Sequence, residues 1–395
     1  MRNIHVAIDY LPLSIALFSI VFGSVVAIRF RIPSLIIFLL IGAIIGTYHL
    51  IGQTAPISFL GELGSILLLF AIGTEFSIDR LLHTAFKKSS IIAVVEITIA
   101  ISVLYVALSS SLPFGSALLL ALALSITSTG TTFKLLKDLK LVKKFDMMLI
   151  VNVSVIEDLI AVFLFSLISS VTLDHSHALQ PIAISFAASI ILFVVAYYAF
   201  NRIFSRVMSK YVRSSEDLLT YSLAILLLFV YLAGSLGLST AFGAYLAGSI
   251  VSGWKGTAAH IERDIKKFSY IFVSFFFLTV GLNVNLNVID FVLLATVLPV
   301  VIMAKAVGIY LGGYAATRDA KKSFYTSAGM LSVGELSLVI VNAAVGSNIL
   351  PDSYLGLTSF IVFFSTIVSF VIMVKVDKVY GFVYELAHAI GFGVS

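Results

Sequence analysis

Long apolar runs separated by short polar breaks dominate this sequence, and they restrict it to a membrane protein. Thirteen such runs can be counted. They lie near residues 11–28, 34–51, 59–76, 89–108, 115–133, 147–170, 181–204, 218–235, 238–253, 268–286, 290–315, 324–346 and 354–376. A helix needs about 20 apolar residues to cross the hydrocarbon layer of a bilayer. The pattern therefore predicts an all-α membrane protein with about 13 transmembrane helices.

The composition excludes a soluble domain. Hydrophobic residues make up 60% of the 395 residues and charged residues only 11%, whereas a soluble domain carries about 25% charged residues. A β-barrel would show short segments of alternating polarity, but these runs are long and apolar throughout. The chain has no cysteine, which excludes disulfides and thiolate chemistry. We expect no cofactor and no nucleic-acid partner.

Basic residues mark one side of the predicted bundle. All lysines and arginines except Arg2 and Lys305 fall in loops on that side. Four loops on the other side contain neither residue type: 52–58, 109–114, 172–180 and 347–352. Because basic loops remain in the cytoplasm, we expect a multi-pass protein of the cell membrane. Its N-terminus would lie outside and its C-terminus in the cytoplasm.

The two halves of the chain resemble each other weakly. One alignment places Gly42 on Gly248, and a second places Gly73 on Gly281. The shift is seven runs, so the second copy would enter the membrane upside down. The predicted organisation of the single membrane domain (1–395) is repeat one at about 8–170, a linker helix at about 181–204 and repeat two at about 218–378. Inverted six-helix repeats of this kind are typical of secondary transporters.

Small polar residues interrupt the fifth and the twelfth run. Gly, Ser and Thr loosen a helix and make backbone carbonyls and helix ends available to an ion. We therefore expect two discontinuous helices that cross in the core. The candidate residues in these stretches are the hydroxyls of Thr127, Ser128 and Thr129 and, as an accessory acid, Glu335.

An adjacent pair of acids lies near the middle of the sixth run. Ionisable groups at mid-bilayer cost about 2.5–3.5 kcal/mol on insertion scales and mark functional sites. Glu157 and Asp158 point about 100° apart on a helix, so they cannot serve one partner equally. Ser154 lies one turn before Asp158, and we expect this hydroxyl and carboxylate to face one monovalent cation. The other interpretation is a buried salt bridge without a transport role.

Three further charges lie within predicted helices. Lys305 is deep in the eleventh run and needs a carboxylate partner, for which Glu157 or Asp158 is the natural candidate. It serves either proton coupling or a purely structural ion pair. Glu75 is an accessory candidate near the end of the third run, and Glu96 has no assignable partner.

At this point the chain resembles the monovalent cation/proton antiporter-2 family over essentially its whole length. The resemblance rests on FAIGTEFSIDRL, TSTGTTFKLLKDLKL, VIEDLIAV, LSVGELSLVI and Lys305. It implies a transporter and not an enzyme, which exchanges Na⁺ or K⁺ for H⁺. Asp158 would be the ion-binding aspartate. The preceding residue in the family is usually Asp, Asn or Gln, so Glu157 is a departure that leaves cation choice and stoichiometry open, with Na⁺ favoured.

The family also implies a six-helix core that moves against a dimerisation domain, and hence a homodimer. Potassium-efflux relatives carry a cytoplasmic nucleotide-binding domain. This chain ends about twenty residues after its last predicted run, so we expect no cytoplasmic regulatory domain.

Three other functions are known for bundles of apolar helices, and each has a requirement that can be compared with this sequence. A cation channel would not need an inverted repeat or a lone acidic site. An intramembrane aspartyl protease needs two facing aspartates, and Asp158 is the one mid-run aspartate found. An organic-solute symporter of related architecture would have a roomier and less acidic site.

Overall fold

The computed structural model describes residues 10–30, 33–51, 54–75, 86–172, 214–235, 240–252, 258–284, 291–334 and 336–389, with isolated positions between 184 and 198. These residues form fifteen helices. Their bounds are α1 (Tyr10–Phe30), α2 (Ser34–Thr47), α3 (Ala55–Glu75), α5 (Phe86–Leu108), α6 (Phe114–Ser125), α7 (Thr129–Asp138), α8 (Met147–Thr172), α11 (Ser215–Ser235), α12 (Thr240–Ser252), α13 (Ala258–Leu282), α14 (Phe291–Thr317), α15 (Ala320–Gly329), α16 (Leu336–Gly346), α17 (Ser353–Val374) and α18 (Val376–Ala389).

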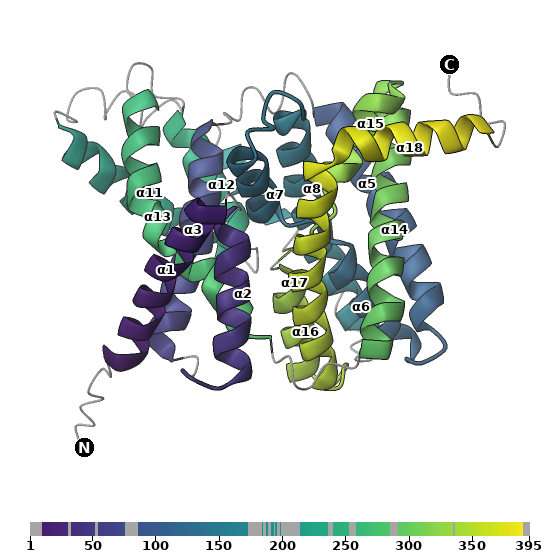
Figure 1. The fold of residues 1–395 in the computed structure, drawn as a ribbon, viewed down its shortest axis with the longest axis horizontal. Helices are drawn as coiled ribbons and strands as arrows, with labels where there is room; N and C mark the ends of the chain where they lie inside the picture. Colours follow the sequence, from purple (N-terminus) through teal and green to yellow (C-terminus); the bar gives the residue numbers. More distant parts are fainter. Residues whose placement is uncertain are drawn as a thin grey trace.

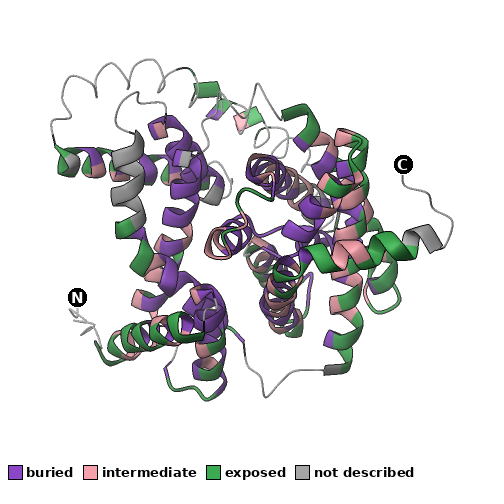
Figure 2. Cartoon of the chain, turned by 45° about the horizontal axis from the view of Figure 1, so that its top comes forward, coloured by how far each residue is buried: buried purple, intermediate pink, exposed green. Residues whose placement is uncertain are grey.

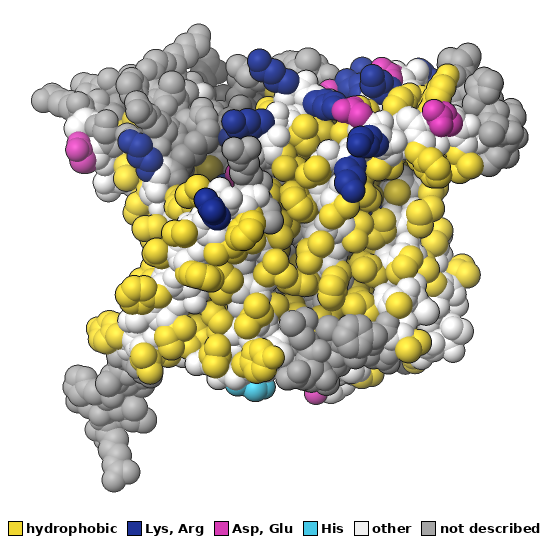
Figure 3. Space-filling view, in the orientation of Figure 1, with side chains coloured by type: hydrophobic (Ala, Val, Ile, Leu, Met, Phe, Trp, Pro, Cys, Tyr) yellow, Lys and Arg dark blue, Asp and Glu magenta, His cyan; other side chains and the backbone are white. Residues whose placement is uncertain are grey.

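Seven of these helices are long and apolar enough to cross a membrane: α1, α3, α5, α8, α11, α14 and α17. Five shorter apolar helices accompany them. The helices run roughly side by side, and apolar side chains cover the visible flank of the bundle while lysines and arginines gather at one end (Figures 1 and 3). The chain is thus an all-helical multi-span membrane protein, as the sequence predicts. The predicted linker helix at 181–204 lies almost wholly outside the described residues.

Two membrane helices are broken at the polar stretches predicted from the sequence. The fifth run forms α6 and α7, and the twelfth forms α15 and α16.

Buried residues concentrate in the centre of the bundle, and exposed residues line its outer helices (Figure 2).

The two breaks cross and satisfy each other's backbone. Thr127 and Val333 form an antiparallel bridge. Ser128 N–H donates to Ser332 O at 2.9 Å, and Gly334 N–H donates to Ile126 O at 2.9 Å. Unwound backbone at membrane depth is tolerated only where protein or water supplies such partners.

Glycines allow two helix pairs to approach closely. A Cβ on Gly42 of α2 would lie 2.9 Å from the Cα of Gly281 on α13. A Cβ on Gly73 of α3 would lie 3.0 Å from the Cα of Gly248 on α12. Small residues at helix interfaces are the usual means of close packing in membranes. These contacts hold α2, α3, α12 and α13 together beside the crossed breaks.

Candidate ion-binding site

A cavity of about 300 Å³ lies where α3, α8 and α13 meet the crossed breaks. We call it the Asp158 cavity. Asp158 from α8, Thr127 and Thr129 from the first break and Gly334 from the second line one part of it. The other lining residues with polar side chains are Glu62, Ser65, Thr240, Thr279 and Asn283. The structure thus brings together two carboxylates, several hydroxyls and unwound backbone, which are hard oxygen ligands for an alkali cation.

The electrostatics of the half-helices favour a negative charge here. Thr129 begins α7 and Gly334 lies just before α16, so the amino-terminal ends of both half-helices border the Asp158 cavity. Amino-terminal helix ends carry partial positive charge, which stabilises an ionised carboxylate. These two helix ends therefore favour the charged form of Asp158.

Ser128 and Ser154 are not among the residues that line the cavity. Ser128 caps α7, because its hydroxyl accepts a hydrogen bond from the Thr131 N–H at 3.2 Å. The hydroxyl of Ser154 is buried and donates to Ile150 O of its own helix at 3.2 Å. Serine hydroxyls often bond back to the preceding helical turn in this way. The predicted convergence of Ser154 and Asp158 on one cation therefore lacks geometric support.

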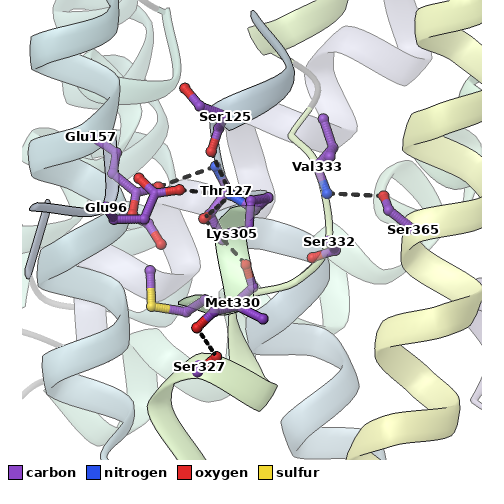
Figure 4. Close-up of polar contacts among 12 residues, drawn as sticks. Glu96, Ser125, Thr127, Glu157, Lys305, Ser327, Met330, Ser332, Val333 and Ser365 are labelled. Atoms are coloured by element: carbon purple, nitrogen blue, oxygen red, sulfur yellow. Dashed lines mark hydrogen bonds and ion pairs between the residues drawn. The ribbon is translucent and has the colours of Figure 1, made fainter. Parts of the chain in front are cut away.

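Glu157 does not line the Asp158 cavity but supports the first break. It is fully buried, and its Oε2 accepts the backbone N–H of Thr127 at 3.1 Å. The hydroxyl of Thr127 donates to Met330 O at 3.3 Å and accepts from Lys305 Nζ at 2.9 Å. Glu157 thus positions a residue of the cavity wall (Figure 4).

Lys305 forms its ion pair with Glu96, which the sequence did not predict as its partner. Its Nζ lies 3.3 Å from Oε1 of Glu96, and both side chains are fully buried. It also donates to the carbonyl of Ser125, the last residue of α6. The prediction named Glu157 or Asp158, whereas the ion pair found is with Glu96; the charge of Lys305 also acts on the nearby Glu157.

The reason lies in how α14 packs on α5. A Cβ on Gly308 would lie 3.0 Å from the Cα of Glu96, so the two helices are close where Lys305 can reach across.

Two predicted accessory acids, Glu75 and Glu335, have side chains outside the described part of the structure. Glu75 is the last residue of α3, but its side chain lies outside the described part of the structure. Glu335 lies outside the described residues altogether. Sequence reasoning missed Glu62, an exposed acid that borders the Asp158 cavity. The available signal was an acid about one turn into the apolar run at 59–76.

An all-helical membrane bundle with two broken helices crossed beside the half-buried carboxylate of Asp158 is typical of a secondary transporter of cations. A family model described as "Sodium/hydrogen exchanger, transmembrane" matches residues 13–376. The chain therefore belongs to the sodium/hydrogen exchanger family. It is a monovalent cation/proton antiporter that exchanges Na⁺ or K⁺ for H⁺, as the sequence predicts.

Similar proteins cover nearly the whole chain. A Na⁺/H⁺ antiporter of Enterococcus hirae is 28% identical over 364 residues, which are 88% of this chain and 92% of that protein. The Na⁺/H⁺-K⁺ antiporter GerN of Bacillus cereus is 26% identical, with 91% and 94% covered. Among solved structures, the sodium proton antiporter MjNhaP1 of Methanocaldococcus jannaschii shares the fold with a TM-score of 0.71. Its sequence identity is 17%, over 93% of this chain and 96% of that one.

Proposed function

We propose that Asp158 binds either one monovalent cation or a proton, and that these two ions compete for its carboxylate. The carrying observation is the Asp158 cavity, where the carboxylate lies with Thr127 and Thr129. A cation that has lost its water needs such oxygen ligands. A protonated Asp158 offers no charge, so protonation releases the cation.

Na⁺ is the favoured cation and K⁺ is the alternative. The relative in Enterococcus hirae is named for Na⁺ exchange, GerN for Na⁺ and K⁺, and KhtU of Bacillus subtilis for K⁺. KhtU is 25% identical over 85% of this chain. The relatives thus differ in the cation for which they are named. Glu157 departs from the residue that usually precedes the ion-binding aspartate of the family, so the resemblance does not fix the cation.

The outer approach to the site passes Glu62. Glu62 is two turns into α3, Thr240 starts α12 and Asn283 follows α13. The loops next to these helix ends, 52–54 and 284–290, contain no lysine or arginine. By the positive-inside rule this end faces outward. The Asp158 cavity is then open toward the outside, with the N-terminus outside and the C-terminus in the cytoplasm.

The exchange proceeds by alternating access of two inverted repeats. In the predicted alignment Gly42 corresponds to Gly248 and Gly73 to Gly281. The contact between Gly42 and Gly281 is therefore the repeat-related copy of the contact between Gly248 and Gly73. Such exchange of partners is expected of two copies related by a two-fold axis in the membrane plane. It supports thirteen helices in two six-helix repeats with one linker.

Strict coupling follows from the cost of moving a bare charge. An uncompensated carboxylate at membrane depth costs several kcal/mol, so the core crosses only when Asp158 carries a cation or a proton.

The family resemblance also supports a homodimer in which the six-helix core of each copy moves against a dimerisation domain.

The test replaces Asp158 by Asn, which has a similar shape and cannot titrate. The purified variant is reconstituted in proteoliposomes, and dissipation of a preset pH gradient is followed on addition of Na⁺, K⁺ or Li⁺. We expect coupled exchange to be lost, whereas the control Asp352→Asn at an exposed helix start retains it. Substantial residual exchange by Asp158→Asn would exclude this carboxylate. Cation flux without proton movement in the wild type would instead indicate a channel.

A further inference from the structure

The last described helix, α18, does not run with the spanning helices. α17 ends at Val374, and α18 starts at Val376. From there α18 extends sideways across the end of the bundle where Lys and Arg gather (Figures 1 and 3). This end is the boundary between the apolar flank and the aqueous phase.

Polar and apolar residues occupy opposite sides of α18. At about 100° per residue, Asp377, Gly381 and Glu385 fall within about 80° of one another on one side. Phe382 and Leu386 fall on the other, together with exposed Val383. Phe382 is 67% exposed and Leu386 is 50% exposed. A helix with large exposed apolar residues along one side is typical of a segment that lies in a membrane interface.

The start of α18 is firmly held by the half-helix α15. Val376 is buried, and the ring of Tyr380 packs against that of Phe324 with centroids 5.3 Å apart. Asp377 accepts hydrogen bonds from the side chains of Lys144 and Tyr325. Lys144 lies between α7 and α8, and Tyr325 lies on α15. The first turns of α18 therefore contact α15, which leads into the second break, and the loop that joins α7 to α8.

We propose that α18 lies in the cytoplasmic interface of the bilayer, with Phe382, Val383 and Leu386 in the lipid, and that it anchors α15 to the membrane surface. The proposal concerns an interaction surface and does not depend on the cation chosen or on the role of Asp158. The occupant of the apolar side is the lipid itself.

Three features favour lipid over a second protein. Val371 and Val374, at the end of α17, are exposed and lead directly onto the apolar side of α18. Lys375 and Lys378 are exposed at its start, where they can meet anionic headgroups. Tyr384 is also partly exposed, and tyrosine is enriched at membrane interfaces.

The absence of cysteine from the sequence makes site-specific labelling straightforward. Single-cysteine variants Phe382→Cys and Leu386→Cys report on the apolar side, and Glu385→Cys is the matched control on the polar side. Each is labelled with an environment-sensitive fluorophore in the full-length protein, reconstituted in vesicles of phosphatidylcholine with phosphatidylglycerol. Retained cation/proton exchange shows that each labelled protein is folded.

We expect the emission at positions 382 and 386 to shift to the blue and to be quenched by doxyl-labelled lipid but not by aqueous iodide. Position 385 should show the reverse pattern. Equal access of iodide to all three positions would overturn the proposal. So would protection of 382 and 386 that disappears when the protein is diluted to one copy per vesicle, because a second copy would then be the occupant.

Discussion

Lys305 on α14 and Glu96 on α5 form a fully buried ion pair, with 3.3 Å between Nζ and Oε1. Glu96 is not among the residues that line the Asp158 cavity. The lysine ammonium is therefore paired with an acid outside the Asp158 cavity. The sequence separation of the pair is 209 residues, close to the 208 residues between Gly73 and Gly281. The two charges thus occupy nearly equivalent positions of the two predicted repeats.

We expect this pair to act mainly as a brace. Breaking a buried pair by removing one partner costs roughly 3–5 kcal/mol, because the other charge is left uncompensated. Lys305→Gln and Glu96→Gln should each lower the temperature of unfolding in detergent. The double variant should lose clearly less than the sum of the two single losses, and a double-mutant cycle gives the coupling.

The same variants separate a brace from a coupling role. If Lys305 is a brace, the membrane-potential dependence of exchange in proteoliposomes stays the same in Lys305→Gln as in the wild type. A changed potential dependence, together with unchanged stability of Glu96→Gln, would show that Lys305 takes part in charge movement.

Sequence reasoning located the breaks and the acids but not their partners. Small polar residues inside an apolar run are visible without a structure, as is a mid-run carboxylate such as Asp158. The partner of Lys305 depends on how α14 is rotated against α5, which Gly308 and other contacts set. The side-chain direction of Ser154 depends likewise on packing. Glu62 was missed because charges near the ends of apolar runs are common.

Glu62 should concentrate cations at the mouth of the Asp158 cavity. An exposed charge contributes on the order of 0.5–1 kcal/mol, and 1.4 kcal/mol corresponds to about tenfold in affinity. In Glu62→Gln we expect the half-saturating Na⁺ concentration on the side that Glu62 faces to rise about two- to fivefold, with little change in maximal rate. The difference should shrink at high ionic strength. Glu216→Gln, exposed at the start of α11, is the control, and an identical effect there would contradict a local role.

Gly73 should tolerate no side chain. A Cβ at this position would lie 2.2 Å from the backbone oxygen of Tyr245, which cannot move as a side chain can. Gly73→Ala should therefore lose about 1–3 kcal/mol of stability through overpacking. At Gly356 on α17 nothing lies within 4 Å of the added atom, so Gly356→Ala should be neutral or slightly stabilising. Thermal unfolding of both variants in detergent provides the comparison, and equal losses would contradict the close contact.

The docking of α18 should be sensitive to acid. Hydrogen bonds from Lys144 and Tyr325 lower the pKa of Asp377 below its usual value. A lowered pKa in the folded state means that the stabilising link is present above the usual pKa and is lost as the pH falls through the lowered one. Spin labels at Lys143→Cys and Glu385→Cys should hold a fixed distance at neutral pH and broaden only in strong acid. With Asp377→Asn added, the distribution should no longer depend on pH. Broadening that starts above the usual pKa of an aspartate would contradict the assignment.

The orientation can be tested with a tag fused after Ser395. The one-sided distribution of lysine and arginine predicts that the tag is reachable only from the cytoplasm. Protease access to the tag in intact cells, with no access in inverted vesicles, would reverse the orientation.

The bridge between Thr127 and Val333 also determines how late in synthesis the two broken stretches can pair. Thr127 is synthesised 206 residues before Val333. At about 5–20 residues per second, this delay is on the order of 10–40 s. Throughout that time the amide groups of Ser128 and its neighbours have no strand partner, so water or the insertion machinery must shield them. A ribosome that stalls before Val333 leaves a membrane-embedded chain whose two breaks never meet.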